Sequence, residues 1–128
     1  MRIVGLGSDI VECLRIRRMI EEHGEQFLLR VFTAKEIRTC QAKRHTTEHF
    51  AARWAAKEAV LRSLGTSGKK STIWTDIETD LGEAGNTIVL IVGGLRELMD
   101  RRGANDVLVT HAFCRAYATA TALAIANG

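Results

Sequence analysis

The chain contains no proline, so its eleven glycines provide the main breaks between elements of secondary structure. Apolar periodicity between these breaks predicts the element order β-α-α-α-β-β-α-β-β. The expected strands are 2–6, 73–79, 87–92, 106–110 and 117–125, and the expected helices are 13–23, 34–41, 46–64 and 95–101. The last of these strands is rich in alanine and also fits a helix. Because strands and helices are mixed without strict alternation, the pattern predicts an α+β fold with a largely antiparallel sheet and packed helices.

The length and composition indicate one globular domain over residues 1–128. Apolar residues make up 46% of the chain and aromatic residues only 5%, so the core must rest on alanine, valine, isoleucine and leucine. Charges interrupt the first 20 residues, which therefore do not resemble a signal peptide. The uncharged run 116–127 is shorter than the roughly 20 residues of a membrane helix. We therefore expect a cytoplasmic protein, with its three scattered cysteines reduced.

The positive charge is concentrated in one half of the chain. Residues 1–70 hold 14 basic and 8 acidic side chains, a balance of +6, whereas residues 71–128 hold 4 and 7, a balance of −3. A basic surface of this kind attracts phosphates, nucleic acid or acidic proteins. The scarcity of aromatic residues argues against a nucleic-acid stacking surface.

Glu58 is the acidic residue whose position is most informative. It shares one face of the expected helix with Phe50, Trp54 and Leu61, which are all large and apolar. A lone carboxylate in such a stripe is too costly to bury, so it must be paired, protonated or bound to a metal. Arg62, four residues further on, is the partner that a purely structural role would use.

Asp9 follows the expected first strand directly after Gly7 and Ser8. A carboxylate at such a turn either faces a cleft or stabilises the start of the next helix, and its position alone favours neither. The preceding Gly5-Leu6-Gly7 is not a dinucleotide-binding fingerprint, because Ile10 occupies the place of the third glycine.

Two further features indicate phosphate binding without proving it. Arg53 and Lys57 are four residues apart on a helix, so their charges repel unless an anion lies between them. The segment 64–70, Leu-Gly-Thr-Ser-Gly-Lys-Lys, could surround a phosphate with main-chain N–H groups and charge, although its glycine spacing is too short for a P-loop. A solvated basic face is the alternative for the helical pair.

A competing motif is His45-Thr46-Thr47-Glu48-His49, which fits the H-x-x-E-H pattern of inverted zinc proteases. Two histidines four residues apart on a helix can bind zinc. The match falls at a helix start, and no obvious third ligand follows it. It is kept as an alternative hypothesis of a zinc hydrolase.

Together, two longer segments resemble the signatures of holo-acyl-carrier-protein synthases. Residues 3–12 read Ile-Val-Gly-Leu-Gly-Ser-Asp-Ile-Val-Glu, and residues 50–59 read Phe-Ala-Ala-Arg-Trp-Ala-Ala-Lys-Glu-Ala, continuing to Leu-Gly-Thr-Ser-Gly at 64–68. Segments 31–36 and 74–78 also look like parts of this family, so the resemblance covers nearly the whole chain. It implies transfer of 4′-phosphopantetheine from coenzyme A to a serine of apo acyl carrier protein, with release of adenosine 3′,5′-bisphosphate, in support of fatty acid biosynthesis.

The resemblance also implies roles for individual residues. Asp9 and Glu58 match the acids that bind Mg²⁺, and Arg62 lies beside them as a third catalytic residue. The expected contacts with coenzyme A are Arg53, Lys57, Ser63, Gly65, Thr66, Ser67, Gly68 and His111. Basic residues on the first helix, Arg15, Arg17 and Arg18, would receive the acidic carrier protein. Family members form trimers with the active site between subunits, so a homotrimer is expected, with no nucleic acid or membrane partner.

The chain departs from the family pattern at three places. Arg62 stands where many members have lysine, which keeps the charge but removes a proton acceptor, since arginine stays protonated. The segment 108–115, Leu-Val-Thr-His-Ala-Phe-Cys-Arg, differs from the usual run around His111, and 84–86 replaces a Gly-Lys-Pro-like turn. The base that takes the serine proton is therefore either a metal-bound water or Glu58.

The main alternative to a transferase is a non-catalytic module that binds an acidic protein or nucleic acid through the basic half. Such a module gives no purpose to Glu58 within an apolar stripe. The intact pair Asp9 and Glu58 also argues against a family member that has lost its activity.

Overall fold

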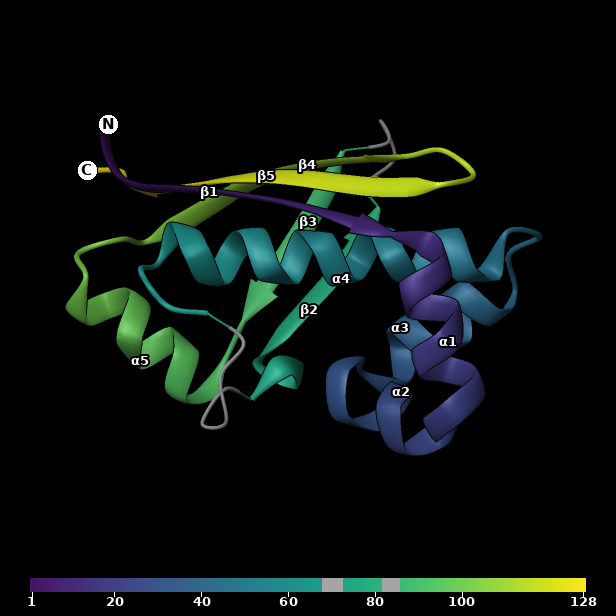
Figure 1. The fold of residues 1–128 in the computed structure, drawn as a ribbon. Coiled ribbons are helices and arrows are strands. Elements are labelled where there is room, and N and C mark those ends of the chain that lie inside the picture. The colour runs from purple at the N-terminus through teal and green to yellow at the C-terminus, as the bar shows by residue number, and fades with distance from the viewer. Residues whose placement is uncertain (68–72, 82–85) are drawn as a thin grey trace.

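The structure is a computed structural model that describes residues 1–67, 73–81 and 86–128. The elements follow one another as in Figure 1. The strands are β1 (Arg2–Glu12), β2 (Ile77–Leu81), β3 (Thr87–Ile91), β4 (Asp106–Phe113) and β5 (Tyr117–Ala126). The helices are α1 (Cys13–His23), α2 (Glu25–Val31), α3 (Ala34–Gln41), α4 (Thr46–Ser63) and α5 (Gly93–Arg101), with a 3₁₀ turn at Trp74–Asp76.

The five described strands form one antiparallel sheet in the order β1-β5-β4-β3-β2. The long helix α4 lies across one face of this sheet, against β1, β5 and β4 (Figure 1). Helices α1, α2 and α3 gather at the end where α4 begins, and α5 lies at the end where α4 finishes. This arrangement confirms the expected α+β fold with an antiparallel sheet.

Most predicted elements are confirmed, and the differences have local causes. β1 continues beyond the expected end at Leu6 to Glu12, because it pairs with β5 along nearly its whole length. α2 was missed, since only a single glycine separates it from α1. The expected strand 73–79 begins instead as a 3₁₀ turn and becomes β2 at Ile77. Segment 117–125 is a strand, not a helix.

Small residues let β1 lie directly on α4. A Cβ atom on Gly5 would stand 1.9 Å from the main-chain oxygen of Ser63, and one on Gly7 would stand 2.2 Å from that of Ala59. Side chains cannot occupy such space, so only glycine permits this approach. The alanines of α4 and of β5 that face each other are buried as well: Ala51, Ala52, Ala55, Ala56, Ala59, Ala118, Ala120, Ala122 and Ala124. The core between α4 and the sheet is therefore thin, and groups on β1 and α4 come within bonding distance.

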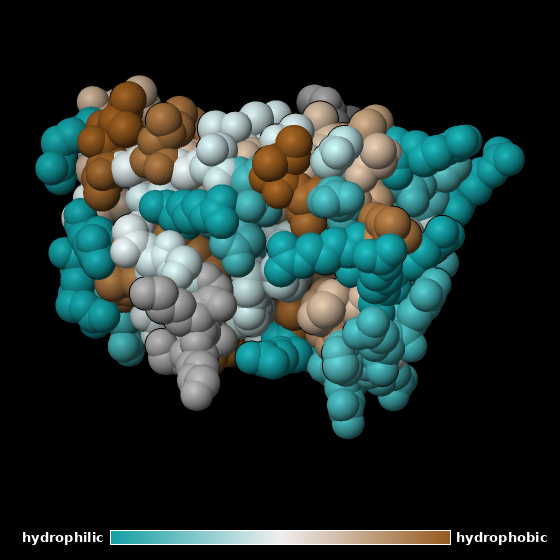
Figure 2. Space-filling model, in the orientation of Figure 1, coloured by the Kyte–Doolittle hydropathy of each residue, from teal (hydrophilic) through white to brown (hydrophobic). Residues whose placement is uncertain are grey.

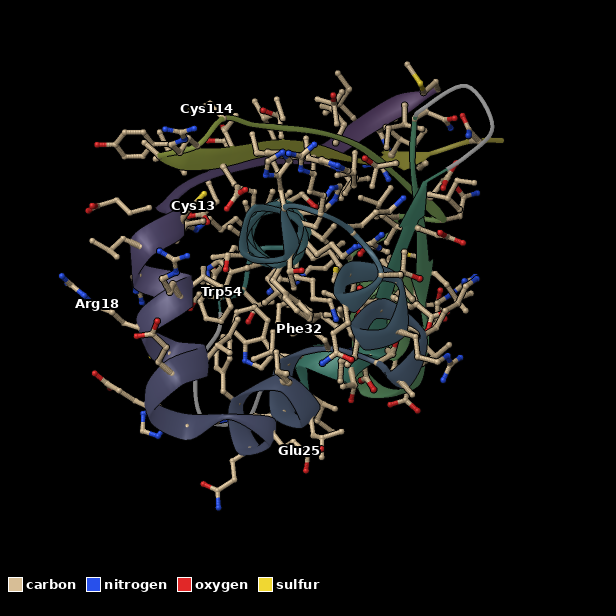
Figure 3. All side chains as sticks on the ribbon, turned by 90° about the vertical axis from the view of Figure 1, so that its right-hand side faces the viewer. Cys13, Arg18, Glu25, Phe32, Trp54 and Cys114 are labelled. Carbon is tan, nitrogen blue, oxygen red and sulfur yellow. The ribbon has the colours of Figure 1, made fainter. Side chains whose placement is uncertain are left out.

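Five of the seven aromatic residues gather on the other side of α4, between α4 and the first helices. Phe32 contacts Phe50 with ring centroids 4.9 Å apart, and Trp54 stacks on Trp74 at 4.7 Å. Phe27 lies 6.0 Å from Trp54. Figure 3 shows Phe32 and Trp54 directed into the space between α4 and the first helices. This cluster fixes the helical end of the molecule to α4.

The second face of the sheet carries apolar side chains that the described residues leave exposed. Register places Leu6, Leu123 and Leu108 in one row across β1, β5 and β4. Leu6 and Leu108 are 65% and 50% exposed, and Ile10 on the same face is 67% exposed. Apolar patches of the molecule follow the sheet along the upper edge in Figure 2.

Within the described residues, no helix has the length and apolar character needed to cross a bilayer.

Candidate active site

Asp9, Glu58 and Arg62 form one charged centre between β1 and α4. The Arg62 Nη1 atom donates to Asp9 Oδ1 at 2.9 Å and to the main-chain oxygen of Ser8 at 2.7 Å. Its Nη2 atom lies 3.5 Å from Glu58 Oε2. The structural role proposed for Arg62 is thus real, and it extends to both acids. The centre arises because Asp9 follows Gly5 and Gly7 on the strand face that lies on α4.

Both carboxylates are largely withdrawn from water. The side chains of Asp9 and Glu58 are 10% and 12% exposed. Burial raises the pKa of Asp9 above its usual range, and the guanidinium of Arg62 only partly opposes this. Burial also raises the pKa of Glu58, opposed by Arg62 and reinforced by the nearby charge of Asp9. Two carboxylates therefore share the one close guanidinium of Arg62, which leaves negative charge where burial disfavours it.

The donor set at this centre fits a hard divalent cation. Asp9 Oδ2 is buried and has no hydrogen-bond partner among the described residues, which is unusual for a carboxylate oxygen. Mg²⁺ binds oxygen ligands, commonly through one or two carboxylates with water and substrate phosphate completing the octahedron. A cation on Asp9 Oδ2 and Glu58 would satisfy the orphaned oxygen and offset the repulsion between the acids. The residues present thus fit the expected metal.

The segment after α4 is held by its own helix cap. The N–H of Thr66 donates to Leu61 O at 2.9 Å and that of Gly65 to Arg62 O at 3.0 Å, which is a Schellman motif. These two N–H groups are therefore engaged within the helix cap, and the expected contacts of Gly65 and Thr66 with coenzyme A stay predictions. Ser67 lies in the described part of the chain, and Gly68 lies outside it.

Ser63 is buried, and its hydroxyl donates to Val60 O at 2.7 Å. It therefore reaches the surface through its main chain, where it lines a cavity of about 180 Å³ with Arg62 and Gly65. The remaining lining comes from β1 and from a residue just beyond α5: Val4, Gly5, Leu6, Leu64 and Arg102. The cavity borders the charged centre because Arg62 belongs to both.

Arg53 and Lys57 are both buried within the subunit, and their expected contact with coenzyme A phosphates stays a prediction. Lys57 is fully buried and donates to Glu36 Oε1 at 2.6 Å and to Val31 O at 2.7 Å. Arg53 is 4% exposed and donates to Thr79 Oγ1 at 3.1 Å. Repulsion between the two cations is relieved by Glu36 inside the protein, not by a ligand. Sequence spacing showed the pair but not its partner, which lies on α3.

His111 shares a row of the sheet with Asp9, since both pair with Ala120. Two strand spacings separate their main chains, or about 10 Å. The Nδ1 atom of His111 lies 2.6 Å from the hydroxyl of Thr87, and burial with the nearby charge of Arg53 lowers the pKa of the imidazole. Within one subunit His111 thus belongs to a different side of α4 from the charged centre.

The basic residues of α1 lie on the surface, as the sequence predicted. Arg15, Arg17 and Arg18 are exposed, and Figure 3 shows Arg18 directed away from the molecule. The Arg15 guanidinium lies 5.9 Å from the centroid of Trp54, and its charge also acts on Asp9 and Glu58. Hydrophilic side chains dominate this helical end in Figure 2. α1 thus presents a positive surface beside the charged centre.

Among the described residues, no third side chain is placed to complete a zinc site with His45 and His49. His45 Nδ1 lies 3.2 Å from Glu48 Oε2, and the ring of His49 packs edge-on against Phe113 at 4.9 Å. Nowhere in residues 1–67, 73–81 and 86–128 do three histidine, cysteine or acidic side chains converge as a metal site would require. A magnesium ion held by two carboxylates needs fewer than three such side chains, so this finding does not bear on Asp9 and Glu58.

Comparison with known sequences identifies the family of the chain. The sequence profile of the 4′-phosphopantetheinyl transferase superfamily matches residues 5–122. The chain is 39% identical over 120 residues to the holo-[acyl-carrier-protein] synthase of Rhodopirellula baltica, covering 94% of this chain and 95% of that protein. It is 37% identical over 126 residues to the synthase of Chlamydia pneumoniae, covering 98% of this chain and all of that protein.

Solved structures of the same kind share the fold. The crystal structure of holo-[acyl-carrier-protein] synthase from Neisseria meningitidis superimposes with a TM-score of 0.87 at 24% identity, covering 96% of this chain and 98% of that one. The Bacillus anthracis synthase in complex with CoA (3′,5′-ADP) superimposes with a TM-score of 0.81 at 26% identity, covering 99% and 100%. The chain therefore belongs to the 4′-phosphopantetheinyl transferase superfamily, in its group of holo-[acyl-carrier-protein] synthases.

Proposed function

We propose that the protein transfers 4′-phosphopantetheine from coenzyme A to a serine of apo acyl carrier protein, with Mg²⁺ held by Asp9 and Glu58. The observation that carries the proposal is the centre in which Arg62 joins two desolvated carboxylates and one oxygen, Asp9 Oδ2, has no partner among the described residues. The names of the relatives and the coenzyme bound in the Bacillus anthracis structure support the choice of substrates.

The reaction requires the serine oxygen to attack the phosphorus attached to pantetheine. A new phosphorus–oxygen bond forms, the bond to the bridging oxygen breaks, and adenosine 3′,5′-bisphosphate leaves with the electron pair. Bound Mg²⁺ would supply charge stabilisation for the diphosphate and the leaving phosphate. The guanidinium of Arg62 orients the two acids and contributes positive charge. The serine proton would pass to a water molecule or to the carboxylate of Glu58.

The donor would lie along the seam between β1 and α4. Arg62, Ser63 and Gly65 line the cavity that borders the charged centre, which supports a nucleotide position at the end of α4. His111, Arg53 and Lys57 lie elsewhere in the subunit, and of the three only His111 is exposed enough to reach a ligand. A contact from His111 to coenzyme A would therefore come from a neighbouring subunit.

The acceptor would dock on α1. The exposed Arg15, Arg17 and Arg18 suit a carrier protein with an acidic helix, and opposite charges accelerate encounter. Arg15→Glu should raise the KM for the carrier protein far more than the KM for coenzyme A. Arg96→Glu, which places the same change on α5 at the far end of the molecule, should have little effect on either constant.

We propose in addition that three copies associate through the uncovered face of the sheet. The exposed Leu6, Ile10 and Leu108, with the half-buried Leu123 between the two leucines, form an apolar surface of the kind that protein interfaces cover. Light scattering after gel filtration should give the mass of a trimer. Leu108→Glu should shift this mass toward the monomer, while Glu97→Gln on the exposed side of α5 should leave it unchanged.

The decisive experiment is the intact mass of an apo acyl carrier protein after incubation with this protein, coenzyme A and Mg²⁺. The proposal predicts the gain of one phosphopantetheine group, and its absence when EDTA replaces the metal. Asp9→Asn and Glu58→Gln should each abolish the gain, whereas Asp100→Asn, an equal loss of charge on exposed α5, should not. No gain with any carrier protein tested would instead favour a non-catalytic binding module for acidic proteins. A role in fatty acid biosynthesis predicts the same result with a fatty-acid carrier.

A further inference from the structure

Two of the three cysteines meet where α1 begins. Cys13 is the first residue of α1, and Cys114 lies in the turn that joins β4 to β5. The thiol of Cys13 donates to the main-chain oxygen of Cys114, with Sγ and O 3.7 Å apart, although 101 positions separate the two residues in sequence. Figure 3 shows Cys114 in the hairpin above Cys13 at the start of α1. The third cysteine, Cys40, is buried on α3.

Main-chain hydrogen bonds hold this contact in place. The N–H of Cys13 donates to Ala116 O at 2.9 Å, and the N–H of Cys114 donates to Tyr117 O at 2.8 Å. The same turn therefore contacts the first residue of α1 and presents Cys114 beside it. A disulfide needs two Cα atoms within about 7 Å of each other. Residues 114–116 lie outside both strands, so they can make the small shift that brings the two sulfur atoms together.

The two thiols differ in exposure in the way that a peroxide-sensitive pair requires. Cys114 is exposed, and the main-chain N–H groups of Tyr117 and Ala116 lower the pKa of its thiol. Thiolates, not thiols, attack peroxides, so Cys114 is the member that reacts first. Cys13 is buried, and burial raises the pKa of its thiol. It is therefore protected from a free oxidant, yet it is held next to any product formed on Cys114, where proximity favours reaction.

A cavity of about 430 Å³ lies beside this contact. Cys13 lines it together with His45 and Thr47 near the start of α4, and Arg115 lines it from the hairpin. The proposed transfer makes no use of this cavity. It leaves room next to Cys13 for a small oxidant and for movement of the turn that carries Cys114.

We propose that Cys114 is a site of oxidation by hydrogen peroxide, and that Cys13 converts the product to a disulfide that joins the β4–β5 hairpin to α1. The Cys114 thiolate attacks one peroxide oxygen, the oxygen–oxygen bond breaks, and a sulfenic acid and one water form. The Cys13 sulfur then attacks the Cys114 sulfur. The sulfur–oxygen bond breaks, and hydroxide leaves with the electron pair and takes the proton of Cys13 as a second water. The two thiols thus lose two electrons, which reduce the peroxide.

The disulfide would restrain the elements on which the proposed function depends, and this part of the inference rests on that function. β1 passes directly into α1 at Cys13, four residues after Asp9. Arg15 lies in the first turn of α1, and its charge acts on both Asp9 and Glu58. A bond from Cys13 to the hairpin pulls on the strand that carries Asp9 and on the turn that carries Arg15. The oxidised protein should therefore transfer phosphopantetheine more slowly than the reduced protein.

Peptide mapping tests the thiol pair without catalysis. The folded native protein is treated with a small excess of hydrogen peroxide, which catalase then removes. The protein is unfolded, its free thiols are blocked with N-ethylmaleimide, and it is digested without reduction. The expected product is a single chain in which Cys13 is joined to Cys114 and only Cys40 carries the maleimide.

Three variants separate the roles of the cysteines. Cys114→Ser removes the exposed thiol and should prevent formation of the disulfide. Cys13→Ala should instead leave a sulfenic acid on Cys114 that dimedone traps. Cys40→Ala is the matched control and should form the native disulfide. A link through Cys40, a link between two chains through Cys114, or an unlinked sulfenic acid on Cys114 of the native protein would overturn the proposal.

Transfer to apo acyl carrier protein before and after peroxide treatment tests the consequence. The native rate should fall on oxidation and return with dithiothreitol, whereas Cys114→Ser should keep its rate through the same treatment. An unchanged native rate with the disulfide fully formed would overturn the effect on transfer. If the reduced native protein does not transfer at all, the proposed function fails, while the mapping result still decides the thiol pair.

Discussion

Replacing Gly7 with alanine should damage both stability and catalysis, because Gly7 sets the distance between β1 and α4. The added Cβ would lie 2.2 Å from Ala59 O and 2.6 Å from Ser63 N, whereas ordinary contacts begin at 3.4 Å. Relief requires β1 to move about 1.2 Å away from α4, the difference between 2.2 and 3.4 Å. Main-chain atoms of a buried helix cannot rotate aside, so we expect the upper end of overpacking penalties, about 3 kcal/mol.

Catalysis should fall for a separate reason. Asp9 lies two residues beyond Gly7 on the same strand face, and its 2.9 Å contact with Arg62 depends on the same approach. A misplacement of about 1 Å at a reacting centre can cost roughly 100-fold in rate. The variant should therefore transfer phosphopantetheine about 100-fold more slowly per folded molecule, even at temperatures where it is fully folded.

Urea unfolding at fixed protein concentration, combined with mass-spectrometric transfer rates, measures both effects. With an m-value of about 1.5 kcal/mol/M, a loss of 3 kcal/mol lowers the midpoint by about 2 M. Gly94→Ala on α5 is the matched control, because its Cβ would meet only Asp76 Oδ2 at 3.9 Å. That control should gain up to about 1 kcal/mol from helix propensity. A Gly7→Ala protein within 0.5 kcal/mol of native stability and with native rates would refute the argument.

Three further predictions follow from the buried and exposed titratable groups. Lys57→Met should lower the free energy of unfolding by about 3–5 kcal/mol, because it leaves Glu36 buried without its cation. The double variant with Glu36→Gln should recover part of the lost stability in the same urea assay. Native stability of the single variant would contradict the prediction. Asp9→Asn should not lower the melting temperature in EDTA, because burial disfavours the charge of Asp9 and so raises its pKa. The same variant should lose the rise in melting temperature that Mg²⁺ gives the native protein. Since a raised carboxylate pKa destabilises the fold above that pKa, the stability gap between this variant and the metal-free native protein should shrink as pH falls from 7 toward the ordinary value of 3.8, and a widening gap would be the wrong sign. Cys114 should be the first thiol to react with iodoacetamide in peptide mapping, because it is exposed and main-chain N–H groups lower its pKa, whereas the other two cysteines are buried; preferential labelling of either buried thiol would contradict this.

The sequence was sufficient for the acids of the site and for most of the elements that carry them. Glu58 stood out because a carboxylate in an apolar helical stripe requires compensation, and the compensation by Arg62 is present at 3.5 Å. The capping box at Thr33 and the stop at Gly65 marked helix ends correctly, since these signals are local and depend on main-chain geometry. The short helix α2 escaped because its boundary with α1 consists only of Gly24.

What the sequence by itself determined, then, was a set of candidates: two acids that could bind a cation, a basic half of the chain and an α+β frame. Only the tertiary structure decided which charges lie at the surface and which pair with one another inside. Arg53 and Lys57 had the spacing of a phosphate site. Lys57 nevertheless turns inward, because Glu36 on α3 accepts its hydrogen bond. Conversely, Gly7 was expected to end the first strand, and together with Gly5 it proved to be the contact that brings Asp9 to Arg62. Spacing along a chain reports neighbours within one element, whereas burial and pairing depend on elements distant in sequence.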